Sequence, residues 1–385
     1  MEKQEYLMYC SVLAVIRNFI NNRKIDVSSI SDMRELYLIC RKHNLAAFMA
    51  NALEQAKDEM DEYEFKQWQA YKNRVTYNSA LFDVEREEIV SFLEKKHIWY
   101  VLLKGLVIRE YYPSPELREM SDNDILVDRA GVPLIHEYML KRGYKIDNYC
   151  QVNDNEYLKP PVYNFEIHSA LFDKDVNPKW TGYYENVIER LVKKENEYQY
   201  VFTKEDFYIY FIIHTYKHFY TGGIGLRTLL DEFLIMRREE ENLDFHYINK
   251  ELKKTGTLEF EKEYRRLAQK VFGQDTESLD ELNDSQKDML LYIFDSGTHG
   301  TYAHVAMHKM GYQSGEEMKM SSRLKFMLSR IFPKPAFFKK YYPITYKYKV
   351  LLPFAYIYRI LKLPFSGRKK AWKQFKAILK NRSRK

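Results

Sequence analysis

The sequence predicts an α+β protein, in which a small mixed-sheet core is embedded between a helical N-terminal region and a helical C-terminal region. Three observations support this prediction. Apolar residues recur at three-and-four spacing through residues 1–95 and again from about residue 205, as in amphipathic helices. Between these regions, short runs rich in β-branched and aromatic residues indicate strands. Strands and helices alternate there over roughly 80 residues, which suits a small α/β unit.

The length and composition are those of a globular protein built from several packed parts. Of the 385 residues, 45% are hydrophobic and 30% are charged, so the chain can bury a sizeable core. We predict four segments, which are a helical leader (1–95), an α/β core (96–200), a helical domain (201–317) and a basic, aromatic-rich helical tail (318–385).

The leader is expected to contain four or five helices. Helical spacing is clearest in "LYLICRKHNLAAFMANALEQ" and in "SALFDVEREEIVSFLEKKH", and both stretches contain few helix breakers.

The core is expected to begin with "IWYVLLKG", a buried strand that Gly105 stops. The next stretch, "LVIREYY", has helical spacing up to the breaker "PSPE", and "NDILVD" is a second strand-like run. A helix is predicted in "VPLIHEYMLKRGYKI", ending near Gly143. Further strand-like pieces follow, and the last is "VYNFEIHSALF".

The helical domain is expected to contain helices around 205–220, 225–240, 245–253 and 257–272, followed by a helical pair within 284–310. Arg227 and Asp231 lie four residues apart on the second of these helices, which favours an ion pair between them.

The basic residues are concentrated in the tail. Residues 318–385 contain 20 Lys and Arg and no Asp or Glu, whereas residues 1–317 have 41 basic against 54 acidic residues, a net charge of −13. Aromatic residues alternate with the lysines of the tail. This pattern suits an RNA backbone with stacked bases or the surface of an anionic membrane. It equally suits a helical cap that neutralises the acidic body, and the three alternatives stay open.

The cysteines and the hydropathy pattern indicate a cytoplasmic protein. The three cysteines are odd in number and lack a C-x-x-C spacing, which favours a reducing compartment. The N-terminal stretch has the pattern of an amphipathic helix, unlike a secretory signal. No apolar run reaches the ~18 residues of a spanning helix. We therefore expect a protein that is soluble or bound peripherally to a membrane through its tail.

Two carboxylates at the start of a strand suggest a metal site. Asp122 and Asp124 occupy alternate positions, so their side chains point to the same face of a strand. Glu166 in "NFEIHS" supplies a third carboxylate from another strand-like run. Convergent carboxylates repel one another unless cations lie between them, and hard oxygen ligands favour Mg²⁺. Two such ions could activate a hydroxyl and hold a triphosphate.

These residues resemble a known superfamily. Lys104 and Gly105 at a strand end, the "YPSP" breaker, Arg118 before the two aspartates, and Glu166 in "FEIH" are similar to the polymerase-β-like nucleotidyltransferases, and most of all to a large bacterial branch of that superfamily. The helical segments on either side resemble the same branch more weakly.

The resemblance implies roles for individual residues. Asp122 and Asp124 would bind the Mg²⁺ ions, Glu166 would be the third carboxylate, and Gly105 with neighbouring amides would meet the phosphates of a nucleoside triphosphate. The expected reaction moves a nucleoside monophosphate to an acceptor hydroxyl and releases pyrophosphate.

Three further residues are candidates for nucleotide binding. Arg118 could clamp a phosphate bidentately, or it could pair with a nearby carboxylate such as Glu116 or Glu119. Lys104 could reach a phosphate. His168 could orient a carboxylate or the substrate, or be a hydrogen-bonded core histidine.

The chain departs from the superfamily pattern in two respects. The gap from Gly105 to Asp122 is longer than in the compact members, and Leu106 follows Gly105 where the superfamily commonly has a serine whose hydroxyl would touch the terminal phosphate. The second departure supports an alternative, in which the chain is a catalytically weak relative that acts as a nucleotide-binding or interaction module. Retention of the three carboxylates supports the enzyme.

Overall fold

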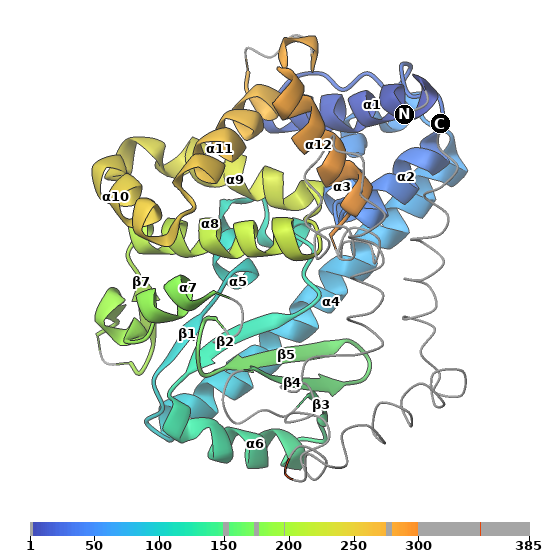
Figure 1. Ribbon diagram of the computed structural model, residues 1–385. Helices are drawn as coiled ribbons and strands as arrows, with labels where there is room; N and C mark the ends of the chain where they lie inside the picture. Colours follow the sequence, from blue (N-terminus) through green and yellow to red (C-terminus); the bar gives the residue numbers. More distant parts are fainter. Residues whose placement is uncertain are drawn as a thin grey trace. The chain divides into compact units, whose positions relative to one another are not determined.

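The computed structural model describes residues 3–148, 154–172, 177–195, 197–274 and 279–298, together with residue 347 (Figure 1). Contacts between residues divide the chain into two compact units. The first comprises Met1–Tyr216 and Gly225–Phe294, and the second comprises Lys217–Ile224 and Asp295–Lys385. The predictions for the basic tail, Lys347 apart, concern residues outside the described ranges.

The leader is helical, as predicted. Its helices are α1 (Lys3–Ile20), α2 (Met33–Lys42), α3 (Ala46–Leu53) and α4 (Glu62–Lys95), with a 3₁₀ helix, η1 (Glu54–Glu59), between the last two. Asp32 and Asp61 cap the N-termini of α2 and α4, because each carboxylate accepts hydrogen bonds from two backbone N–H groups of the first turn. Helix α3 is almost entirely buried, as its composition of alanine, leucine, methionine and phenylalanine predicts.

The core is a five-stranded mixed sheet, which confirms the predicted α+β class. Its strands are β1 (Tyr100–Leu102), β2 (Asn123–Val127), β3 (Lys145–Asn148), β4 (Asp154–Lys159) and β5 (Tyr163–His168). The strand order is β1-β2-β5-β4-β3. The central strands β2 and β5 run parallel, and the other neighbours are antiparallel.

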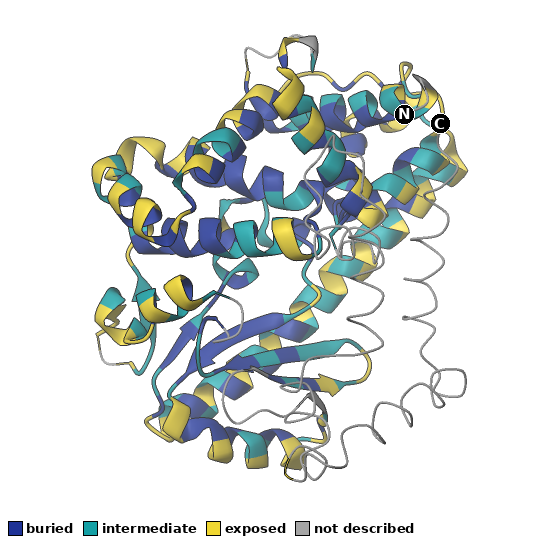
Figure 2. Ribbon diagram, in the orientation of Figure 1, coloured by how far each residue is buried: buried dark blue, intermediate teal, exposed yellow. Residues whose placement is uncertain are grey.

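One face of the sheet packs against two helices. Ile125 and Val127 of β2, with Phe165 and Ile167 of β5, are buried in a cluster with residues of α4 and of α6 (Val132–Lys141). Figure 2 shows the buried strands at the centre of the sheet. Side chains alternate between the faces of a strand, so even-numbered residues of β2 and β5 point to the opposite face. The candidate site therefore lies on the face of the sheet opposite α4 and α6.

The connection from β1 to β2 contains short helical turns. They are α5 (Gly105–Ile108), η2 (Arg109–Tyr111) and η3 (Pro115–Leu117). The helix predicted in residues 106–112 is therefore shorter and partly 3₁₀. The prolines that follow cannot continue a helix.

The C-terminal helices agree closely with the predicted ranges. They are α8 (Lys204–Thr221), α9 (Leu226–Glu239), α10 (Phe245–Thr255), α11 (Leu258–Phe272) and α12 (Asp284–Ser296), with short 3₁₀ helices η6 (Glu240–Asn242) and η7 (Leu279–Glu281). Gly256 ends α10 with φ of 77°, a conformation that glycine adopts without a steric cost. The second helix predicted within 284–310 lies mostly outside the described residues.

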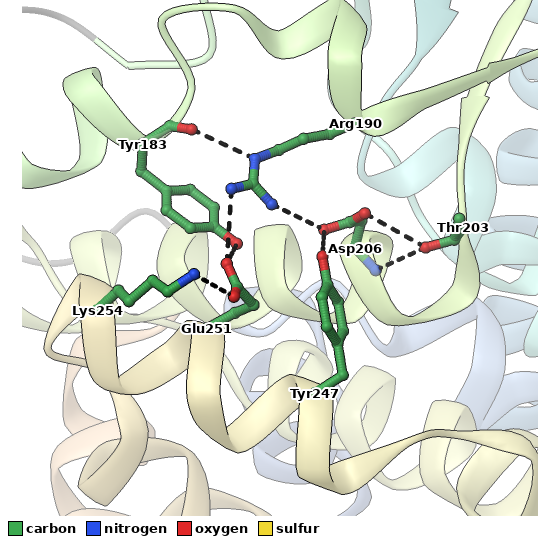
Figure 3. A network of polar contacts seen from close by, with 7 residues as sticks. All are labelled: Tyr183, Arg190, Thr203, Asp206, Tyr247, Glu251 and Lys254. Carbon is green, nitrogen blue, oxygen red and sulfur yellow. Dashed lines mark hydrogen bonds and ion pairs between the residues drawn. The ribbon is translucent and has the colours of Figure 1, made fainter.

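A segment between the sheet and α8 had no predicted structure. It contains α7 (Pro178–Tyr183), η5 (Val187–Arg190) and a hairpin of β6 (Leu191–Lys193) and β7 (Tyr200–Phe202). The Arg190 guanidinium holds this segment to two helices, because it lies 3.4 Å from Asp206 of α8 and 3.5 Å from Glu251 of α10 (Figure 3). It also stacks on the Tyr183 ring, 3.8 Å from its centroid.

The same network satisfies both acids. Tyr183 and Tyr247 donate hydrogen bonds to Glu251 and Asp206, respectively, at 2.8 and 3.0 Å (Figure 3). All the groups drawn have partners within the network, so we assign it a structural role.

A buried pair of acids lies among the C-terminal helices. Glu232 of α9 and Glu261 of α11 are fully buried, and the Tyr208 hydroxyl lies 2.7 and 2.9 Å from one oxygen of each. One hydroxyl proton cannot serve two carboxylates. Arg265 donates to Glu261, which marks Glu261 as the ionised partner. Burial raises the pKa of Glu232 to about 8, so Glu232 is largely protonated at neutral pH.

We expect stability to fall as pH rises because of Glu232. Its pKa is higher in the folded chain than the ordinary 4.5, so the folded state holds the extra proton between about pH 4.5 and 8. Stability is greatest below that window and is lost as pH rises through it. Glu232→Gln mimics the protonated acid, and should be more stable than the parent at pH 8.5 by on the order of a few kcal/mol.

The measurement is urea unfolding between pH 5 and 8.5. Glu259→Gln, at an exposed position of α11, is the matched control and should follow the parent curve. Other acids whose pKa values are raised affect the stability of the parent and of Glu232→Gln equally. The difference in stability between the two proteins therefore reports Glu232 alone. Parallel curves for the two proteins would contradict the assignment.

Candidate active site

The register of β2 and β5 brings the predicted acids together. Asp124 pairs with Glu166 and Leu126 pairs with His168 across these parallel strands. Asp124, Glu166 and His168 alternate with the core-facing residues of their strands, so all three project from the face opposite α4 and α6. Asp122 lies just before β2, which begins at Asn123.

Asp124, Glu166 and His168 form a compact cluster. His168 Nε2 lies 2.7 Å from Asp124 Oδ1 and 3.6 Å from Glu166 Oε2. One possible ligand atom from each of the three residues lies within 4.8 Å of the others. Asp122 does not belong to this group. The structure therefore brings together two of the three predicted carboxylates with the imidazole.

Burial and charge separate the acids by pKa. Burial alone would raise the pKa of Asp124, but the Lys104 ammonium and the hydrogen bond with His168 hold it well below the usual range. Burial and the charge of Asp124 raise the pKa of Asp122. Burial and the charges of both aspartates raise the pKa of Glu166 to about 7. The negative charge is thus crowded, and a bound cation would relieve the crowding.

Lys104 is part of this site. Its ammonium lies 2.7 Å from Asp124 Oδ1, the same oxygen that His168 contacts. Its backbone φ is 47°, a value that residues other than glycine seldom adopt. In the structure the ammonium pairs with Asp124, and its contact with a nucleotide phosphate stays a prediction.

Arg118 pairs with a residue that the sequence analysis did not name as its partner. Its Nε and Nη2 donate to the two oxygens of Asp231 at 2.9 and 2.8 Å, and both side chains are buried. Tyr112 donates to the same carboxylate at 2.7 Å. The alternative partners named for Arg118, Glu116 and Glu119, are therefore wrong.

The partner predicted for Asp231 is also wrong. Arg227, one turn before Asp231 on α9, donates instead to the backbone carbonyl of Glu119. Glu119 accepts hydrogen bonds from the Ala47 N–H and the Tyr71 hydroxyl. Asp231 is buried beside the chain that precedes β2, where Arg118 reaches it with two N–H groups. Long-range packing has thus outweighed the helical i,i+4 spacing.

Gly105 allows Arg118 to approach the start of α5. A Cβ atom on residue 105 would lie 2.5 Å from Arg118 Nη1 and 3.0 Å from the sulfur of Met120. Any larger residue would displace the guanidinium. Arg118 Nη1, which is not used by Asp231, therefore packs directly on the glycine at which the phosphates were predicted to bind.

The donor set fits a divalent cation. Carboxylate oxygens are the ligands that Mg²⁺ prefers, and imidazole nitrogen suits softer divalent metals. Ligand atoms of a common metal at about 2.1 Å lie about 3 Å apart, close to the Asp124–His168 distance. Asp124, Glu166 and His168, on one face of a small mixed sheet, are therefore a candidate metal-binding group.

Comparison with known families then identifies the chain. Residues 29–273 match the family described as uncharacterised nucleotidyltransferases, and the chain belongs to that family. The predicted family and the predicted enzyme class are confirmed. No curated protein and no solved structure shows a significant match. Within the described residues, no helix is long and apolar enough to cross a membrane.

Asp231 and Tyr112 are the residues of the site region that the sequence analysis missed. Asp231 lies 113 residues after Arg118 in the chain. No local spacing could have joined the two. The one available signal was an aspartate within the largely apolar run "LLDEFLI" of α9, because a buried acid requires a partner.

Proposed function

We propose that this nucleotidyltransferase moves a nucleoside monophosphate from a nucleoside triphosphate to an acceptor hydroxyl in the presence of Mg²⁺. In the reaction, the acceptor hydroxyl gives up its proton to water, its oxygen forms a bond to the α-phosphorus, the bond between that phosphorus and the oxygen that bridges it to the β-phosphorus breaks, and pyrophosphate leaves. The observation that carries this proposal is the register of Asp124 with Glu166, which places two carboxylates side by side on one face of the sheet.

Each site residue has a role in this proposal. Asp122 and Asp124 would hold the metal that carries the triphosphate, and Glu166 would share a second ion with them. Bound ions of this kind lower the pKa of the attacking hydroxyl and neutralise the developing phosphate charge. His168 keeps the Asp124 carboxylate in one orientation through its 2.7 Å contact.

The phosphates would lie near Gly105. Arg118 Nη1 lies close to this glycine, and Asp231 fixes the guanidinium plane through two hydrogen bonds. Arg118 can therefore present one N–H group to a phosphate at little cost in conformational entropy. The acceptor could be a sugar, an antibiotic-like small molecule, a protein side chain or an RNA end.

A ligand titration tests the proposal. Melting temperatures are measured with Mg²⁺ and each of the four ribonucleoside triphosphates, separately and together. Ligand binding to the folded state stabilises it, by about 2.7 kcal/mol at a ligand concentration 100 times Kd. We expect at least one triphosphate with Mg²⁺ to raise the melting temperature of the parent, and Glu166→Gln to reduce that increase.

A second candidate function rests on Leu106, which supplies no hydroxyl to the terminal phosphate. In that case the chain binds a nucleotide without transferring it. Release of pyrophosphate in the presence of an acceptor-rich lysate distinguishes the two. Stabilisation by nucleotide without pyrophosphate release favours the binding module, and no stabilisation by any triphosphate contradicts both.

A further inference from the structure

Lys104 occupies a backbone conformation that favours glycine. Residues Leu103–Leu106 form a tight turn, closed by a hydrogen bond of 3.2 Å from the Leu106 N–H to the Leu103 carbonyl. Lys104 stands at the second position of this turn, with φ of 47° and ψ of −116°. A side chain in this region costs on the order of 1–3 kcal/mol. The chain therefore has a lysine at a position where glycine would adopt the same backbone conformation without strain, although a glycine, Gly105, is the next residue.

The lysine side chain reaches the centre of the site. Lys104 Nζ lies 2.7 Å from Asp124 Oδ1, and its side chain keeps 22% of its surface exposed, against 4% for Asp124. His168 contacts the same oxygen. The Asp124 carboxylate thus already has a cation beside it, and a metal ion bound to either of its oxygens would lie close to that ammonium.

A metal ion and the ammonium compete for this carboxylate. Two cations on one carboxylate repel each other, so metal binding favours departure of the ammonium. Lys104 is directly bonded to Gly105, where the phosphates are proposed to lie, so a rotation of its side chain alone can carry the ammonium towards them. A phosphate would then replace the carboxylate as the partner of the ammonium.

We infer that Lys104 is a movable internal cation, which neutralises Asp124 in the ligand-free protein and passes to a nucleotide phosphate when the metal binds. The inference rests on the proposed function and adds a regulatory property to the same site. The metal and the triphosphate bind as a coupled pair, and each binds weakly alone. The ammonium also supplies the phosphate contact that Leu106 cannot make.

Linkage makes the coupling measurable. The factor by which the triphosphate raises metal affinity equals the factor by which the metal raises triphosphate affinity. In the parent we expect a factor of about 10 or more, within the range usual for coupled sites. Removal of the ammonium frees Asp124, so metal alone should bind more tightly. The triphosphate should bind more weakly, and the coupling factor should fall.

Calorimetry on the full chain tests this. The probes are Mn²⁺ alone, the α,β-methylene analogue of ATP alone, and the two together; the methylene group prevents turnover. Lys104→Met keeps the turn and removes the charge, and Lys104→Gly removes the charge while relaxing the turn. Both are expected to bind Mn²⁺ alone about tenfold more tightly than the parent and to show a smaller coupling factor, because only the direct contact between metal and triphosphate is left. Lys104→Arg should retain part of it.

The matched control is Lys141→Met. Lys141 is an exposed residue of α6, on the helical side of the sheet, and its partner is Glu137. This variant should bind both probes as the parent does. Two outcomes are separable. If Mn²⁺ binds the parent and both Lys104 variants with equal affinity, the inference about Lys104 fails alone. If the parent binds neither probe nor their mixture, the proposed function fails with ATP and the inference with it.

Discussion

Asp122→Asn and Asp124→Asn are expected to abolish nucleotide transfer equally while shifting the stability of the metal-free protein in opposite directions. Both aspartates are assigned to the metal. Burial and the neighbouring Asp124 charge raise the pKa of Asp122, so its ionised form is unfavourable in the fold and its neutral amide should stabilise the protein. The pKa of Asp124 is held low, so its ionised form is favourable.

The expected loss for Asp124→Asn comes from its partners. The substitution leaves the Lys104 ammonium without a carboxylate in a largely buried place. Loss of one member of a buried pair costs about 3–5 kcal/mol, and the partial exposure of Lys104 reduces this to about 2–3 kcal/mol. A like-charge argument from the sequence alone predicts that both substitutions stabilise. The structure reverses the sign for Asp124 because a cation lies against it.

The measurement is urea unfolding of both variants without metal, beside an assay of pyrophosphate release. Transfer at the parent rate by either variant would remove that residue from the site. If both substitutions changed the free energy of unfolding by the same amount in the same direction, the opposite pKa shifts assigned to Asp122 and Asp124 would be wrong.

Asp231→Asn is expected to give the largest loss of stability among single substitutions near the site. Asp231 keeps 1% of its surface exposed and accepts two hydrogen bonds from Arg118 and one from Tyr112. The amide leaves the Arg118 guanidinium buried without a counter-charge. Breaking such a pair by removing one partner costs about 3–5 kcal/mol. Transfer should also weaken, since Arg118 loses its fixed plane beside Gly105.

A double-mutant cycle separates the pair from the general effect of the substitution. Arg118→Met combined with Asp231→Asn should be more stable than Asp231→Asn alone, because no unpaired charge stays buried. Asp288→Asn, at an exposed position of α12, should change stability by less than about 0.5 kcal/mol. Additive losses in the double variant would show that the two residues do not stabilise each other.

The sequence by itself determined the class of fold and the place of the acids along it. Alternation over "NDILVD" and "NFEIHS" is a strong signal, because one face of each run must be apolar to pack against helices. Once Ile125 and Ile167 face the core, Asp124 and Glu166 must face away from it. The helices of the C-terminal region followed in the same way from apolar spacing, to within a few residues.

Only the tertiary structure decided which charges meet. The alternation of side chains along each strand does not predict that β2 and β5 are neighbours in the sheet. Their parallel register in the structure places Asp124 opposite Glu166. The partner of Arg118 arrives from α9, far along the chain, and Lys104 turns its ammonium to Asp124 through an unusual backbone conformation. The spacing of residues along the sequence predicts only contacts within one helical turn or one strand. The partner of a buried charge depends on the distances between groups and on their removal from water, and both are properties of the folded chain.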